Sequence, residues 1–262
     1  MTYVVRRTGI LFIIVSLLLI GCNSDRDEKS DNTEIVSEKS VAKPSIQEPK
    51  IQWPQPGKVK EFFTQYGQEN QETKVKLKTR LGDIVIELFE DTPLHRANFI
   101  HHIKRGLYYK TIFYRVVPGF MIQGGNSDND ATLEKRENVG AYYIPSEVSP
   151  KHIHERGAVA MAMSYVNNPE MKSAQYSFYI VIGTPFTEKG LKATEDEYGM
   201  KVPQENREVY MTIGGSPHLD GKHTVFGRVL EGMDVVEAIA AEKRDSGDWP
   251  VNDVVIEYEI LD

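Results

Sequence analysis

The chain contains a single cysteine, Cys22, in 262 residues. Without a second thiol it cannot form an intrachain disulfide, even in an oxidising compartment. Positive charge is also in short supply, because 31 Lys and Arg residues stand against 38 Asp and Glu, for a formal net charge of -7. Nucleic-acid backbones select clustered positive charge, so nucleic acid is not an expected partner.

The apolar run at residues 10–20 is too short for a spanning helix, which needs ~20 residues. It follows two arginines, as does the apolar region of a secretory signal peptide. The run ends in Leu-Ile-Gly-Cys, which resembles the bacterial lipobox. This resemblance implies that residues 1–21 are a signal peptide and that Cys22 becomes the lipidated first residue. A plain signal anchor with an incidental cysteine is the alternative.

Lipid on Cys22 is the expected membrane attachment, because an acidic chain is not drawn to anionic headgroups. Asn23 lacks the aspartate that retains enteric lipoproteins at the inner membrane. We therefore expect a lipid-anchored protein of the bacterial cell envelope, at the outer membrane, on its periplasmic face or at the cell surface. The acidic stretch 25–28 leaves export to the surface open.

Composition divides the rest of the chain. Residues 22–56 are rich in Ser, Lys, Glu, Asp and Pro, and predict a flexible tether. Residues 57–74 are an N-terminal extension of open role, in which aromatic residues at helical spacing over 57–70 indicate a short amphipathic helix docked on the domain. A domain over residues 75–262 follows, interrupted by a charged insertion at about 184–214 that could hold helices of its own.

Hydrophobic periodicity in the domain is mostly of period two. A hairpin is predicted at 75–89, and Thr92 as N-cap, Pro93 and the stop at Gly106 delimit a helix. Further strands are predicted at 111–117, 157–163, 176–182, 224–229 and 254–260, and a second helix at 233–240. Many short strands with few helices indicate an all-β sandwich or closed barrel.

The most informative stretch, FYRVVPGFMIQGG at residues 113–125, closely resembles the signature of the cyclophilin-type peptidyl-prolyl cis-trans isomerases. Other segments agree with that family in order and spacing: 86–89, 97–99, 157–162, 177–180 and 219–227. The resemblance covers about residues 75–262. It implies an all-β fold, a closed antiparallel eight-stranded β-barrel capped by two helices, which acts as a monomer on proline-containing polypeptides without cofactor or metal.

The family's chemistry is rotation about Xaa-Pro bonds, which requires no covalent intermediate. The resemblance makes Arg115 the catalytic arginine and Gln123 the glutamine that orients it and binds substrate backbone. Strand alternation places Arg115 on the side of Phe113 and Val117, in an apolar pocket. Residues matched to substrate binding are Phe120, Met121, Tyr179 and Leu219 in the proline pocket, Met163 through its backbone, and His218 and Ser177 around them.

Several positions depart from the family pattern. Tyr114 stands where histidine is common and is expected to point away from Arg115 with little effect. His218 replaces a tryptophan at the rim, which implies weak cyclosporin binding. Ser177 replaces glutamine and Tyr179 replaces phenylalanine, changes that could alter substrate choice.

Other interpretations stay open. A proline-binding chaperone or scaffold could retain the same fold, and the insertion at 184–214 could recruit a partner. The histidines at 95, 101, 102, 152 and 154 lack the spacing of a known metal site and favour packing roles. Gly124-Gly125 is not followed by the Gly-Lys-Ser/Thr of a phosphate loop, which favours a tight turn.

Overall fold

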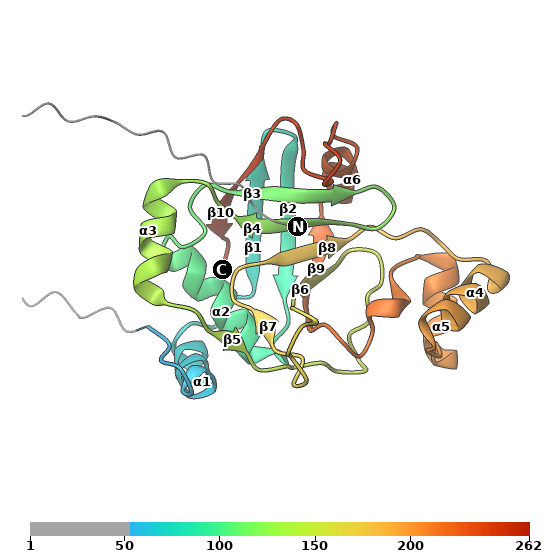
Figure 1. Cartoon of the computed structure of the whole chain (residues 1–262), viewed down its shortest axis with the longest axis horizontal. Helices are drawn as coiled ribbons and strands as arrows, with labels where there is room; N and C mark the ends of the chain where they lie inside the picture. Colours follow the sequence, from blue (N-terminus) through green and yellow to red (C-terminus); the bar gives the residue numbers. More distant parts are fainter. Residues whose placement is uncertain (1–52) are drawn as a thin grey trace, which may run out of the picture. The chain divides into compact units, whose positions relative to one another are not determined.

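Eight antiparallel strands close into a barrel in the computed structural model, which describes residues 53–262 (Figure 1). The predicted signal peptide, Cys22 and the predicted tether up to residue 52 lie outside the described residues. The prediction of a closed antiparallel eight-stranded barrel is confirmed. In order around the barrel the strands are β1 (Lys74–Thr79), β10 (Val254–Ile260), β3 (Thr111–Val117), β4 (Met121–Asn126), β8 (Phe178–Val181), β6 (Ala158–Met161), β9 (Val225–Glu231) and β2 (Gly82–Leu88). A separate two-stranded sheet pairs β5 (Tyr143–Ile144) with β7 (Ser173–Ala174).

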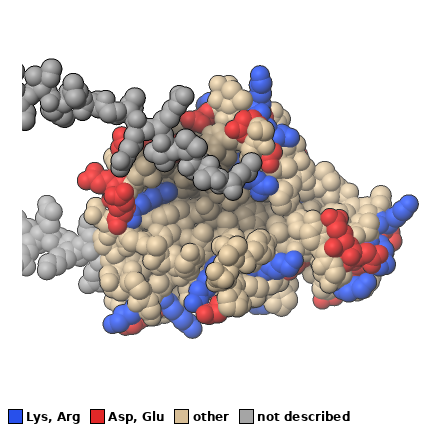
Figure 2. Space-filling view, in the orientation of Figure 1, with Lys and Arg blue, Asp and Glu red and all other residues tan. Residues whose placement is uncertain are grey.

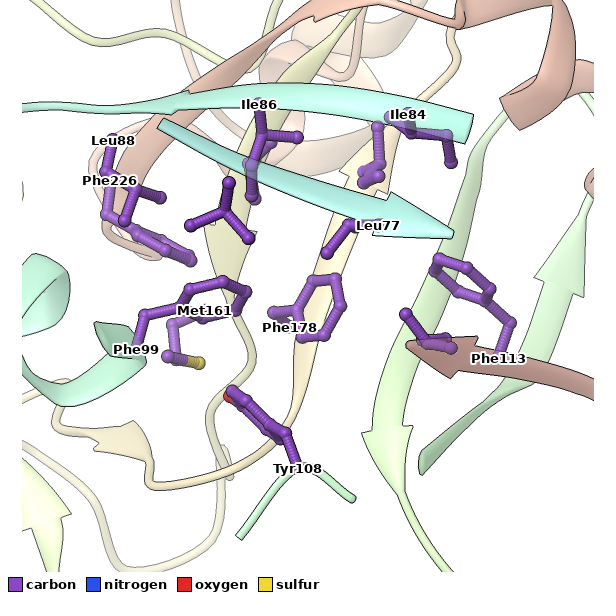
Figure 3. Close-up of a cluster of buried hydrophobic side chains, with 14 of the residues drawn as sticks. Leu77, Ile84, Ile86, Leu88, Phe99, Tyr108, Phe113, Met161, Phe178 and Phe226 are labelled. Atoms are coloured by element: carbon purple, nitrogen blue, oxygen red, sulfur yellow. The ribbon is translucent and has the colours of Figure 1, made fainter. Parts of the chain in front are cut away.

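Alternation along the strands fills the barrel with apolar side chains. In β1, Val75 and Leu77 are fully buried, whereas Lys76 and Lys78 between and beyond them are partly exposed. Burial of a large apolar side chain stabilises by ~1.5–3 kcal/mol, so this interior dominates the stability of the domain. Figure 3 shows the inward-pointing members, among them Leu77, Ile84, Ile86, Leu88, Phe113, Met161, Phe178 and Phe226.

Strand β4 is the barrel strand that periodicity did not predict. Its second half contains Gly124 and Gly125, which interrupt the apolar alternation. Both glycines are required by close packing: a Cβ on Gly124 would lie 3.0 Å from the Phe113 ring, and one on Gly125 would lie 2.1 Å from the carbonyl oxygen of Tyr176. Gly125 also has φ +98°, which side chains rarely adopt. The two glycines therefore belong to a strand and not to a tight turn.

Helix α2 (Pro93–Lys104) packs against the barrel interior, as predicted. Its Phe99 ring centroid lies 5.3 Å from that of Phe178 and 5.5 Å from that of Phe226. The predicted stop is present, because Gly106 adopts φ +66° just past the helix. Most of α2 is buried, including polar side chains, so its environment is that of a core helix.

The N-terminus of α2 is capped differently from the prediction. Thr92 occupies the N-cap position, but its hydroxyl donates to the carbonyl of Phe89 and makes no capping bond. The carboxylate of Glu147 accepts the backbone N–H groups of Leu94 and His95 at 2.9 and 3.0 Å instead. Because Glu147 lies far along the chain, no local pattern identifies this cap.

Helix α1 (Val59–Glu69) packs against α2, so the predicted amphipathic helix is present and docked on the domain. Its aromatic face encloses His101 of α2. Rings that meet His101 nearly perpendicularly, with centroid separations of 4.9–5.8 Å, belong to Trp53, Phe62, Phe63 and Tyr66. The packed region therefore begins upstream of residue 57.

This aromatic enclosure makes folding stability depend on pH. Burial, assisted by Arg105, lowers the pKa of His101 from 6.5 to about 4, and neither ring nitrogen has a hydrogen-bond partner in residues 53–262. Between these pH values the unfolded chain binds more protons than the folded one, so the free energy of unfolding falls as pH decreases from 6.5 to 4. We expect His101→Phe to be neutral or stabilising at pH 7 and to lose less stability over this range. Urea unfolding at several pH values measures the free energy of unfolding and its change with pH. An equal loss of stability between pH 6.5 and 4 in the variant and the wild type would contradict the lowered pKa of His101.

The charged insertion contains two helices, α4 (Glu188–Tyr198) and α5 (Gln204–Thr212), as the length of the segment 184–214 suggested. Arg207 of α5 joins them, because its guanidinium pairs with Glu188 at 2.5 Å and with Glu195 at 2.9 Å. On the face drawn in Figure 2, side chains of both signs gather over α4 and α5, whereas uncharged residues cover most of the centre. The insertion is thus a folded helical hairpin beside the barrel.

Three further helical elements complete the domain: α3 (Asp130–Val139), the 3₁₀ helix η1 (Pro217–Leu219) and α6 (Met233–Ala240). Helix α6 has its predicted bounds, whereas α3 was not predicted, because few of its residues are apolar. Arg136 anchors α3 by donating to the carbonyls of Leu107 and Gly125. None of the helices in residues 53–262 has the length and apolar character needed to cross a membrane.

Candidate active site

Three polar or aromatic side chains form a row across the outside of the barrel, where β3, β4 and β8 are neighbours. The strand register pairs Arg115 with Gln123, and Gln123 with Tyr179. Because side chains alternate in direction, Ile122 points into the core while Met121 belongs to a separate apolar cluster on the outer face. The run 113–125 thereby brings its outward-facing residues to one surface.

This row lines a cavity of about 330 Å³. The structure brings eight of the nine predicted site residues together in its wall: Arg115, Phe120, Met121, Gln123, Met163, Tyr179, His218 and Leu219. Four lining residues were not predicted: Ala162, Tyr165, Tyr198 and His223. Ser177 is the predicted residue that does not line the cavity.

The floor of the cavity is apolar and fixed by packing. Met121, Tyr179 and Leu219 are almost fully buried members of the outer cluster, and Phe120 packs against them. Aromatic and thioether surfaces of this kind favour a compact apolar ring over a polar group. The floor therefore suits the side chain of proline, which carries no hydrogen-bond donor.

Arg115 does not share a side with Phe113, and this part of the prediction is wrong. The pairing of β3 with β4 shifts register on both sides of Phe113. As a result Phe113 lies fully buried in the barrel core, whereas the Arg115 side chain is 43% exposed at the edge of the cavity. A bulge of this kind breaks the simple alternation on which the prediction depended.

The nearest acidic partner of Arg115 is Asp248, in the segment between α6 and β10. Arg115 Nε lies 3.6 Å from Asp248 Oδ2, and Arg244 Nε lies 3.2 Å from Asp248 Oδ1. The backbone carbonyl of Asp248 also accepts the N–H of Val116 at 2.9 Å, which fixes this segment beside β3. Exposed ion pairs contribute only ~0–1 kcal/mol, so Asp248 steadies the guanidinium without preventing it from turning toward a ligand.

Gln123 is oriented by Tyr114 and not by a direct bond to Arg115. Its Nε2 donates to the Tyr114 hydroxyl at 2.5 Å, and that hydroxyl donates to Ser177 Oγ at 3.1 Å. Burial raises the pKa of Tyr114, so the phenol stays protonated. Tyr114 therefore contacts a predicted site residue directly, and Ser177 lies behind it; together they turn the carbonyl oxygen of Gln123 away from Tyr114. Binding of substrate by Ser177 stays a prediction.

A buried polar network supports Tyr179 from below. Its hydroxyl lies 3.0 Å from His154 Nε2, and His154 Nδ1 donates to Asp220 Oδ1 at 2.9 Å. The Tyr210 hydroxyl of α5 donates to the other carboxylate oxygen of Asp220 at 2.5 Å. Since the carboxylate accepts from Nδ1, Nε2 is free to accept from Tyr179. Burial raises the pKa of Tyr179 well above 10, and the network satisfies its hydroxyl so that the ring can line the cavity.

The other histidines have packing or hydrogen-bonding roles. His223 donates from Nδ1 to the carbonyl of Met161 and accepts from the Tyr165 hydroxyl at Nε2, and burial lowers its pKa to about 4. His95 bonds to Glu147, and His102 donates to the carbonyl of Gln175. Within the part of the chain that the structure describes, no cluster of three or more His, Cys, Asp or Glu residues has the arrangement of a metal site.

Comparison with known families assigns most of the chain. Residues 74–259 match the family model described as cyclophilin type peptidyl-prolyl cis-trans isomerase/CLD. A Staphylococcus epidermidis protein named "Putative peptidyl-prolyl cis-trans isomerase" is 38% identical over 190 residues, which cover 72% of this chain and 91% of that protein. Proteins of the same name from Staphylococcus haemolyticus and Staphylococcus aureus are each 36% identical, over 72% and 71% of this chain and 91% and 90% of theirs.

The fold is also similar to solved structures. A cyclophilin type peptidyl-prolyl cis-trans isomerase from Cryptosporidium parvum, crystallised in the presence of the dipeptide Ala-Pro, superposes with a TM-score of 0.52 at 21% identity, covering 72% of this chain and 99% of its own. A second structure of that protein gives the same TM-score at 22% identity, covering 73% of this chain and 98% of its own. The family match, the relatives and the barrel agree: this chain belongs to the cyclophilin-type peptidyl-prolyl cis-trans isomerases, enzymes that catalyse rotation about Xaa-Pro bonds.

Proposed function

We propose that this isomerase acts as a monomer on proline-containing polypeptides during the folding of envelope proteins. The observation that supports the substrate is the cavity, where an apolar floor lies directly beside Arg115 and Gln123. The Cryptosporidium protein of the same fold was crystallised in the presence of a proline dipeptide, which agrees with a proline ligand.

The chemistry required of the site follows from the amide bond. Rotation about an Xaa-Pro bond faces a barrier of ~18–20 kcal/mol, because twisting removes the conjugation of the nitrogen with the carbonyl. In the twisted state the proline nitrogen recovers a lone pair. With the proline ring on the apolar floor, the guanidinium of Arg115 donates to that lone pair and stabilises the twisted state over both planar states.

The remaining stabilisation comes from holding the peptide on either side of the bond. A hydrogen bond from a charged donor contributes ~1.5–3 kcal/mol, which is about 10- to 150-fold in rate. In this proposal the carbonyl oxygen of Gln123 accepts a backbone N–H of the substrate, which is supported by its direction away from Tyr114. Met163, at the cavity wall, offers backbone groups for the opposite side.

The activity is tested by the cis-trans exchange rate of an Ala-Ala-Pro-Phe peptide, measured by NMR exchange spectroscopy with the purified full-length chain in mild detergent. We expect acceleration over the uncatalysed exchange, which takes tens to hundreds of seconds. Binding of the peptide without any acceleration would favour the alternative of a proline-binding chaperone.

We further propose that lipid on Cys22 holds the enzyme at the cell envelope, at the outer membrane. Support comes from the sequence around Cys22 and from the acidic composition, which offers no attraction to anionic lipid. Mass spectrometry of the mature N-terminus should find an acylated Cys22, and Cys22→Ser should release the protein from the membrane fraction. An unmodified Cys22 would contradict this proposal.

A further inference from the structure

The insertion places one aromatic residue at the mouth of the cavity. Helix α4 ends at Tyr198, because Gly199 adopts the left-handed conformation with φ +62°. The Tyr198 ring stacks on His218 with a centroid separation of 4.6 Å and an interplanar angle of 27°. His218 in turn faces Phe120 at 5.6 Å and 32°. The three rings form a ladder from the apolar floor to the outside.

The insertion is held firmly enough to keep Tyr198 in place. Leu191 and Tyr210 are fully buried in one apolar cluster with Val202, and Ile153, which lies outside the insertion, packs against this cluster. The hydroxyl of Tyr210 donates to Asp220, which immediately follows Leu219 of the floor. The position of α4 is therefore coupled to the floor of the cavity as well as to its rim.

A second exposed tyrosine lines the cavity from a different segment. Tyr165 is 66% exposed, yet its hydroxyl is fixed by a 2.6 Å hydrogen bond to His223 Nε2. The loop that carries it is closed by the Asn168 side chain, whose amide donates to the carbonyls of Ser164 and Lys172 at 3.0 and 2.8 Å. Tyr165 is thus an ordered aromatic side chain with a free face.

We infer that Tyr198 and Tyr165 extend the proline pocket into a subsite for an aromatic or large apolar side chain next to the substrate proline. This inference rests on the proposed isomerase function. The cavity of about 330 Å³ is in the ~300–1,000 Å³ range of pockets for drug-sized ligands, which exceeds the needs of the three methylenes of a proline ring. Tyr198 is 46% exposed, so both tyrosines retain ring surface for a ligand. The insertion then acts as a determinant of substrate choice.

The test compares kcat/KM for peptides with Ala, Leu or Phe directly before or directly after the proline. We expect the wild type to prefer Phe and Leu over Ala in at least one of these positions. Tyr198→Ala should reduce that preference about three- to tenfold, the change expected for loss of one aromatic stacking contact. Tyr198→Phe keeps the ring and should retain the preference. Tyr143→Ala, which removes a similarly exposed tyrosine that does not line the cavity, is the matched control.

The possible results separate the inference from the proposed function. If Tyr198→Ala lowers kcat/KM equally for all peptides, Tyr198 only supports His218, and the inference is overturned. An unchanged preference for Phe and Leu over Ala would overturn it as well. If the wild type accelerates no peptide, the isomerase proposal fails. In that case NMR titration measures the dissociation constants of the same peptides. Tighter binding of the Phe and Leu peptides that is lost in Tyr198→Ala supports the subsite. Absence of such a preference overturns the subsite.

Discussion

Replacing Arg115 with alanine is expected to lower kcat/KM for a proline peptide by about 10- to 150-fold. Arg115 is the single Lys or Arg among the residues that line the described cavity, so the variant removes the cationic donor beside the apolar floor. Its side chain is 43% exposed and pairs only weakly with Asp248, so the loss of stability should stay within ~0.5 kcal/mol. Exchange spectroscopy gives the rate, and thermal unfolding checks that the fold is retained.

Two further variants separate the contribution of Gln123 orientation from that of the guanidinium. Tyr114→Phe leaves Arg115 in place but removes the acceptor that orients Gln123, so we expect a smaller fall of about two- to tenfold. Arg115→Lys keeps the charge but loses the planar fork of donors, and should recover little activity. An Arg115→Ala rate equal to that of the wild type would contradict the proposed mechanism.

Much of the fold could be predicted because the relevant signals are local. In β1 and β10 the apolar and polar residues alternate along the strand, and in α2 a proline stands at the first helical position. Such signals lie within a few neighbouring residues, and the predicted bounds are nearly those observed. Periodicity did not predict β4, because Gly124 and Gly125 carry no side chains that could alternate. The need for glycine at these positions is visible only from the residues packed against them. Helix α3 is held by Arg136 and not by an apolar stripe, so hydrophobic pattern could not find it.

The site was predicted as a set of residues but not as a geometry. The family signature located Arg115 and Gln123, yet the bulge at Phe113 turns that residue into the core, while Arg115 lines the cavity on the outer face. The partners that orient them come from elsewhere in the chain: Asp248 approaches Arg115 from the segment after α6, and Ser177 meets Gln123 through Tyr114. Contacts between residues so far apart have no periodicity that a single sequence can display.

Glu147 is the strongest example of such a distant contact. Besides capping α2 through the N–H groups of Leu94 and His95, its Oε2 accepts from His95 Nδ1 at 2.7 Å. His95 is fully buried, and its other nitrogen bonds to Ser173 Oγ at 2.9 Å. One carboxylate therefore satisfies three donors at the point where α2 enters the core.

Glu147→Ala should consequently destabilise the domain by about 3 kcal/mol, because the N-cap is lost and buried donors are left without an acceptor. For a domain of this size that corresponds to a fall in melting temperature of about 6–12 °C. Glu147→Gln keeps one carbonyl acceptor without the charge and should lose roughly half as much. Glu134→Ala, at an exposed position of α3, is the control and should change stability by no more than ~0.5 kcal/mol. If Glu147→Ala has the same melting temperature as the control, water or another side chain must accept the N–H groups at the N-terminus of α2. The distant cap would then not be what holds this helix against the barrel.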